Sequence, residues 1–178
     1  MEPTLTLLSR LFGEKTQRAR LEPLYRAVVA AGRARAWYVE GKVPDTVEGR
    51  FDMIASLLAL VLLRLEQEGG GAKAESVLLT EAFIDDMDGS LRQIGIGDFT
   101  VGKHIGRLMG ALGGRLQKFR EALAEGGDME AEARCNIFRD SPPDEDSLAF
   151  VARGLKAFAA GLAERSPEQL LRGELPSP

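Results

Sequence analysis

Apolar residues recur along this chain at three- and four-residue steps, the spacing of one face of a helix. The best examples flank the glycine turn Gly95-Ile96-Gly97-Asp98. Before the turn they are Phe83, Met87, Leu91 and Ile94, and after it Ile105, Leu108, Met109, Leu112, Leu116, Phe119 and Leu123. No stretch of the sequence shows the period-two alternation of a half-buried strand. The pattern predicts an all-α fold.

Breakers and capping residues divide the N-terminal part into three predicted helices. An amphipathic stretch over residues 5–12 ends at Gly13, and Pro23 fits the first turn of the next helix, which ends near Gly32. The most apolar run, residues 53–63, belongs to a buried core helix that ends near Glu68. We expect Asp45 to be its N-cap, with Glu48 completing a capping box.

The rest of the chain predicts further helices, six to eight in total, in one domain spanning residues 1–178. An acidic helix covers about 72–94, and a basic helix leads from the turn to about 126. Asp128 can cap a helix through residue 138, which Ser141-Pro142-Pro143 breaks. A long helix over 145–165 and a short turn at Ser166 complete the chain. We expect a core of about 20–140 and a helical extension of 141–178.

Four glycines form an unusual stripe on the basic helix, each four residues from the next: Gly102, Gly106, Gly110 and Gly114. Glycine inside a helix costs about 1 kcal/mol relative to alanine, so the stripe suggests a benefit elsewhere. Small residues allow another backbone to approach closely. We predict packing against a neighbouring helix of the same chain, with a partner's helix as the alternative.

Composition and charge restrict the class of protein. The 178 residues include 44% hydrophobic and 28% charged residues, as in globular proteins, with a net charge of −4. Residues 1–42 are mildly basic, which suits an anionic surface such as a membrane face. No basic stripe is interleaved with aromatic residues, so we expect no nucleic-acid partner.

The single cysteine and the apolar runs indicate a cytoplasmic protein. Cys135 has no partner for an intrachain disulfide, and its neighbours predict a buried small hydrophobe. The start of the sequence does not look like a signal peptide. The run over residues 53–63 is shorter than the ~20 residues of a spanning helix. Any membrane contact is expected to be peripheral.

Two short motifs resemble catalytic sites. The segment from Asp86 to Leu91, DMDGSL, resembles the signature of haloacid-dehalogenase-type phosphatases, in which two aspartates and magnesium carry the chemistry. Residues 97–104 resemble a phosphate-binding loop, with His104 in the place of a hydroxyl. Both motifs require a preceding strand, and the flanking pattern here is helical. We therefore expect no catalysis and no cofactor.

Metal binding is also not expected, and the acidic cluster has two interpretations. His104 is the only histidine, and it is predicted to lie at the surface or an interface. The spacing around Asp86 does not fit an EF-hand. The acidic cluster of Asp85, Asp86 and Asp88 is either a solvated face or a surface complementary to a basic partner or to the basic helix.

Several segments together resemble the ubiquinol–cytochrome c chaperone family. They are Val43-Pro44-Asp45-Thr46, Gly49-Arg50-Phe51-Asp52-Met53, residues 83–92, the turn Gly95-Ile96-Gly97-Asp98, Val101-Gly102-Lys103, and Ala133-Arg134-Cys135-Asn136-Ile137-Phe138. The resemblance spans about residues 20–140. One departure is Leu112-Gly113 before Gly114-Arg115, where the family often has an aromatic pair.

The resemblance implies an all-helical chaperone that binds protein without catalysis. It implies assistance to the maturation of cytochrome b, or to its assembly into respiratory complex III. Carried over by motif, the expected partner-binding residues are Asp86, Asp88, Arg92, Gly95, Gly97, Asp98 and Lys103. Asp98 has an alternative role as a helix cap. A chaperone predicts an apolar groove with charged rims, whereas a plain helical adaptor predicts no effect on respiration.

Overall fold

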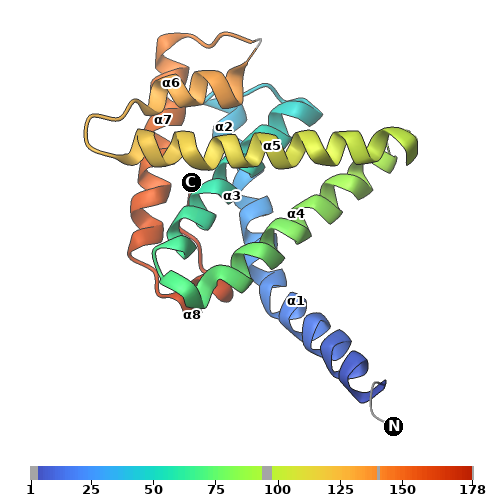
Figure 1. The fold of residues 1–178 in the computed structure, drawn as a ribbon. Helices are drawn as coiled ribbons and strands as arrows, with labels where there is room; N and C mark the ends of the chain where they lie inside the picture. The colour runs from blue at the N-terminus through green and yellow to red at the C-terminus, as the bar shows by residue number, and fades with distance from the viewer. Residues whose placement is uncertain (1–3, 94–97, 140, 178) are drawn as a thin grey trace.

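The computed structural model describes the backbone of residues 4–93, 98–139 and 141–177, and every regular element in these ranges is helical (Figure 1). Side chains are described from residue 18 onward, except those of residues 70, 71, 91–105, 107, 108, 140 and 178. The prediction of an all-α domain with six to eight helices is confirmed. No helix among the described residues is long and apolar enough to cross a membrane.

The helices follow one another with short connections. They are α1 (Thr4–Gly32), α2 (Arg35–Val39), α3 (Val47–Glu66), α4 (Lys73–Gln93), α5 (Asp98–Leu123), α6 (Met129–Ala133), α7 (Glu145–Ala163) and α8 (Pro167–Leu171). A 3₁₀ turn, η1 (Gly69–Ala72), precedes α4, and a π-helical turn, η2 (Arg134–Phe138), follows α6.

Helix α3 is the centre of the fold. Its apolar residues lie around its whole circumference, as expected for a fully buried helix. Between Asp52 and Leu63 every residue is buried. Helices α1, α4, α5 and α7 and the turn η2 all contact it. Since each buried leucine contributes about 1.5–3 kcal/mol, this one helix accounts for much of the hydrophobic core.

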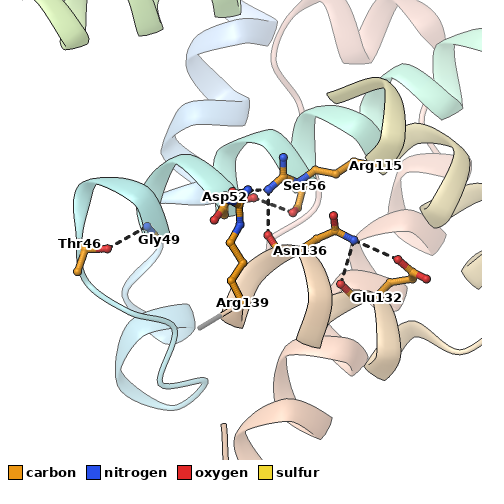
Figure 2. Close-up of polar contacts among 8 residues, drawn as sticks. All are labelled: Thr46, Gly49, Asp52, Ser56, Arg115, Glu132, Asn136 and Arg139. Carbon is orange, nitrogen blue, oxygen red and sulfur yellow. Dashed lines mark hydrogen bonds and ion pairs between the residues drawn. The ribbon is translucent and has the colours of Figure 1, made fainter. Parts of the chain in front are cut away.

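The start of α3 differs by one residue from the prediction. Thr46, not Asp45, is the N-cap: it has an extended backbone, and its Oγ1 accepts a hydrogen bond from the Gly49 N–H at 3.0 Å (Figure 2). Asp45 instead pairs with Arg50 at 2.6 Å. A Cβ atom at Gly49 would collide with the Pro44 carbonyl oxygen, so the turn into α3 requires glycine.

The N-terminal prediction is wrong in two places. Helix α1 runs without a break from Thr4 to Gly32, so Gly13 does not end a helix and Pro23 lies inside one. A proline inside a helix costs about 3 kcal/mol or more. Burial offsets that cost here, because Leu21, Leu24 and Val28 of α1 are buried in the core.

The C-terminal predictions are confirmed apart from Cys135. Asp128 caps α6 by accepting from Ala131 N–H at 2.9 Å, and Ser166 caps α8 in a capping box. Helix α7 begins and ends within two residues of the expected bounds. Cys135 is exposed, because the π-helical winding of η2 turns Ile137 and Phe138 into the core in its place.

Candidate protein-binding groove

A groove of about 690 Å³ lies between α3, α4 and α5. Figure 1 shows α4 and α5 as two sides of a wedge that diverge toward α3 and η1. The apolar residues that line the groove are Leu62, Ala72, Val77, Ile84, Met109 and Leu116. Val77 is 52% exposed and Met109 43% exposed, so the apolar lining is in contact with solvent. Concave, mostly apolar surfaces with a few polar groups are where proteins usually bind their ligands.

Helix α4 presents one continuous face to the groove. The lining residues from this helix are Lys73, Ser76, Val77, Thr80, Glu81 and Ile84, at three- and four-residue steps. The Ser76 hydroxyl donates to the Ala72 carbonyl at 3.0 Å, and the Thr80 hydroxyl donates to the Ser76 carbonyl at 2.8 Å. Because both hydroxyls donate to carbonyls of their own helical segment, this face behaves as a largely apolar surface.

Helix α5 divides its surface between the core and the groove. Leu112, Arg115 and Phe119 are buried on the side that contacts α3. Met109 and Leu116, two turns apart, face the groove. Methionine is flexible and polarisable, and it adapts to ligands of irregular shape. The same helix therefore supplies part of the core and one wall of the groove.

The glycine stripe does not pack against another helix of this chain, so the prediction is wrong for its described members. A Cβ atom on Gly106, Gly110 or Gly114 would meet no heavy atom within 4 Å, and all three glycines are exposed. The environment of Gly102 lies outside the described part. The apolar face, whose burial is more favourable, turns toward α3 and leaves the glycines to solvent. Docking of a partner's helix stays a prediction.

Charged residues form the rims of the groove. Glu66 pairs with Arg120 at 2.7 Å, which joins α3 to α5. On the opposite rim Arg18 of α1 pairs with Glu81 at 3.0 Å and with Asp85 at 3.1 Å. Exposed ion pairs of this kind contribute about 0–1 kcal/mol to stability. Their larger effect is on the encounter with a charged partner.

Beneath the α5 wall lies a buried ion pair that the sequence analysis did not single out. Asp52 of α3 is 2% exposed and Arg115 of α5 is 1% exposed, and their side chains form a salt bridge (Figure 2). Arg115 also donates to the Asn136 carbonyl at 2.9 Å. Arg139 reaches the same Asp52 oxygen at 2.7 Å. The cluster joins α3, α5 and η2, and so holds α5 in place.

Burial dominates the electrostatics of this cluster. It raises the pKa of the Asp52 carboxyl above its ordinary value, against the opposing effect of Arg115 and Arg139. It lowers the pKa of Arg115, which remains a cation because arginine titrates far above neutrality. The Arg115 guanidinium also lies 5.9 Å from the centre of the Phe51 ring, within the range of a cation–π contact.

Two of the predicted partner-binding residues have described side chains. Asp86 is half-buried between α4 and α1, where the Tyr25 hydroxyl donates to it at 2.7 Å. Burial and this carboxylate raise the pKa of Tyr25, so the phenol keeps its proton. Asp88 lies one turn beyond Ile84, which lines the groove. The segment from Asp86 to Leu91 is helical, so the phosphatase-like motif has no strand before it.

The other predicted contacts lie outside what the structure describes. Gly95 and Gly97 fall in the 94–97 segment, and only the helical backbone is described for Arg92, Asp98 and Lys103. For His104, too, only the helical backbone is described. In the described ranges, His, Cys, Asp and Glu residues form no group of three that could hold a metal ion.

Comparison with known proteins identifies the family. The model of the ubiquinol–cytochrome c chaperone family matches residues 39–176. The chain belongs to the ubiquinol–cytochrome c chaperone family. Its fold is similar to the crystal structure of the Cbp3 homolog from Brucella abortus, with a TM-score of 0.77 and 28% sequence identity over 96% of each chain. No curated protein matches the chain.

The family-like segments of the sequence meet in the buried cluster. Asp52 comes from the segment 49–53, and Asn136 comes from the segment 133–138. Arg115 follows Gly114 in the sequence, directly after Leu112-Gly113. Two features of the sequence could have predicted this ion pair: an aspartate inside the most apolar helix and an arginine on the core face of α5. Buried charges require partners, so each of the two residues implies the other.

Proposed function

We propose that this protein is an assembly chaperone of respiratory complex III and that the groove binds an apolar segment of a complex III subunit, with cytochrome b as the expected client. The observation that carries the proposal is the groove between α4 and α5. Its walls expose apolar side chains to solvent, and its rims are charged. Membership of the ubiquinol–cytochrome c chaperone family supports it.

The proposed action is reversible binding without catalysis. A newly made membrane subunit exposes apolar surface that aggregates in water, and covering that surface is favourable by about 25 cal/mol per Å². The client is a membrane subunit, so we place the protein in the cytoplasm, in peripheral contact with the inner membrane. The residues Asp88, Arg92, Asp98 and Lys103 continue the walls of the groove in sequence, and we propose them as rim contacts.

A matched pair of substitutions tests the proposal. Val77→Glu places a charge in the groove, whereas Val47→Glu makes the same change at the start of α3, where the valine is 58% exposed. We expect the free energy of unfolding of both variants to lie within about 0.5 kcal/mol of that of the wild type, because both positions are exposed. In cells that depend on this protein, Val77→Glu should lower assembled complex III, and Val47→Glu should not.

Affinity capture from the same cells identifies the client. The wild type and Val47→Glu should retain cytochrome b or another complex III subunit, and Val77→Glu should lose it. Normal complex III in cells without the protein would contradict the chaperone function and favour a plain helical adaptor. Normal complex III with Val77→Glu alone would exclude the groove as the binding site.

A further inference from the structure

We infer that the groove receives a single apolar α-helix of about three turns, with its Lys- or Arg-bearing end against the acidic half of α4. This inference rests on the proposed function, because it specifies the kind of segment that the client presents. It is carried by the lining of the groove, by the open edge of α5, and by the distribution of charge along α4.

The lining favours a helical occupant over an extended one. In the described part of the chain the walls are helices, whose backbone groups are already paired, and Ser76 and Thr80 donate to nearby backbone carbonyls. An extended segment would bring its own N–H and C=O groups against this surface without partners, at about 1–3 kcal/mol for each buried group. A helix satisfies its backbone internally, as it does in a membrane.

The length of the groove sets the length of the helix. On α4 the lining runs from Lys73 to Ile84, about 16 Å at 1.5 Å per residue. That distance matches three turns of an occupant helix. Side chains at i, i+3 or i+4, and i+7 of such a helix would meet Val77, Met109 and Leu116.

The outer edge of α5 allows close approach. Gly106 lies three residues before Met109, and Gly113 lies four residues after it. At this spacing both glycines are on nearly the same side of α5 as Met109. Neither has any heavy atom within 4 Å of the position of a Cβ. Small residues allow two helix backbones to approach closely. The glycines therefore adjoin the groove wall and leave room for an occupant helix beside Met109.

The charge along α4 orients the occupant. From Glu81 to Asp88 the helix carries four carboxylates and no basic residue, whereas in its first turn the charges of Lys73 and Glu75 balance. Arg18 supplies one positive charge to this region, so its net charge stays negative. Membrane-spanning helices carry excess Lys and Arg at their cytoplasmic ends. Complementarity thus places that basic end near Glu81 and Asp85 and the apolar end toward η1.

Peptide binding to the purified full chain tests the inference. The probes are fluorescent helical peptides of about 12 Leu and Ala residues, three turns, with a short run of either Lys or Glu at one end. We expect the Lys-flanked peptide to bind about tenfold more tightly, with an advantage that falls as salt rises. Glu81→Lys with Asp85→Lys should remove the advantage. Val77→Glu should weaken both peptides, and Val47→Glu neither.

A zero-length carbodiimide cross-link tests the orientation, because it joins a peptide lysine to a carboxylate in contact with it. We expect products at Glu81 or Asp85. Products only at Glu66, beside η1, would reverse the orientation and overturn that part of the inference.

Two further probes test the helix itself. A peptide of the same composition with central prolines should bind at least about tenfold more weakly, since proline breaks the helix. Equal binding of that peptide, or displacement of the helical peptide by a fatty acid of equal affinity, would overturn the inference in favour of an extended or a lipid occupant. Either result leaves the complex III test of the proposed function unaffected, so the two failures are distinguishable.

Discussion

The two sides of α5 contrast strongly. The side that faces α3 is closed: Leu112 and Phe119 are buried, and Arg115 forms its ion pair with Asp52 in the interior. The other side is open: Met109 lines the groove, and a Cβ atom at Gly110 would meet no heavy atom within 4 Å. One helix thus combines a buried, packed interface with a solvent-exposed one.

The difference separates stability from function within a single helix. The closed side contains charges that are tolerated only because each has a partner, so a change there is expected to affect folding. The open side exposes apolar area that stabilises nothing in the isolated chain, so a change there is expected to affect binding. Four substitutions test this separation, from the largest expected effect on stability to the smallest.

Arg115→Ala breaks the closed side most severely. It leaves Asp52 buried with only the half-exposed Arg139 as a partner, and removing one member of a buried pair costs about 3–5 kcal/mol. We expect a loss of this size in the free energy of unfolding, measured by urea denaturation. The double variant Asp52→Leu with Arg115→Met should recover much of it, since apolar residues can replace a buried pair. A loss below about 1 kcal/mol in Arg115→Ala would refute the structural role of the cluster.

Gly49→Ala tests the start of α3, the helix against which the closed side of α5 packs. The added methyl group meets the Pro44 carbonyl oxygen, so the cap must shift, and overpacking of this kind costs about 1–3 kcal/mol. The measurement is the midpoint of thermal unfolding by circular dichroism. A higher midpoint would show that the turn before α3 has room for a side chain.

Tyr25→Phe tests how the α4 wall is held against α1. Loss of the hydrogen bond to Asp86 should cost about 1–2 kcal/mol at neutral pH. The contribution of Tyr25 to stability also depends on pH. The folded-state pKa of Tyr25 is raised above the unfolded value near 10, so this contribution is present below about pH 10 and is lost as the pH rises further.

The alkaline loss of stability should therefore be smaller in Tyr25→Phe than in the wild type. Part of the loss should remain in the variant, because burial also raises the pKa of Tyr38, to about 12. The measurement is the free energy of unfolding between neutral pH and about pH 12. Parallel curves for the two proteins would show that Tyr25 ionises equally in both states.

Gly110→Ala has the smallest expected effect, and its sign is opposite. The added methyl group meets no heavy atom within 4 Å, and alanine is favoured over glycine in a helix by about 0.8–1 kcal/mol. We expect a gain of up to this size in the free energy of unfolding. A clear destabilisation would mean that the glycine stripe packs against the chain itself, and the contrast between the two sides of α5 would fail.

The sequence predicted much of the local structure. The periodic apolar positions located α3, α4, α5 and α7, and the capping residues Asp128 and Ser166 marked two helix starts. The family-like segments also indicated the chaperone family. These features depend on residues that are close in the chain, and a side chain three or four positions away is present in any fold.

Other outcomes depended on which surfaces meet. Pro23 lies inside α1 because the leucines on either side are buried by other helices, and Cys135 is exposed because η2 winds as a π-helix. Asp52, Arg115 and Asn136 are far apart in sequence, and only the packing of α3, α5 and η2 joins them.

The candidate groove shows the same division. The sequence determined the periodic apolar positions of α4 and α5 and the row of glycines on α5. Tertiary structure decided that the core covers Leu112 and Phe119 but leaves Met109 and Gly110 open. The physical reason is that periodicity specifies which face of a helix is apolar, whereas the burial of that face depends on the position of every other helix.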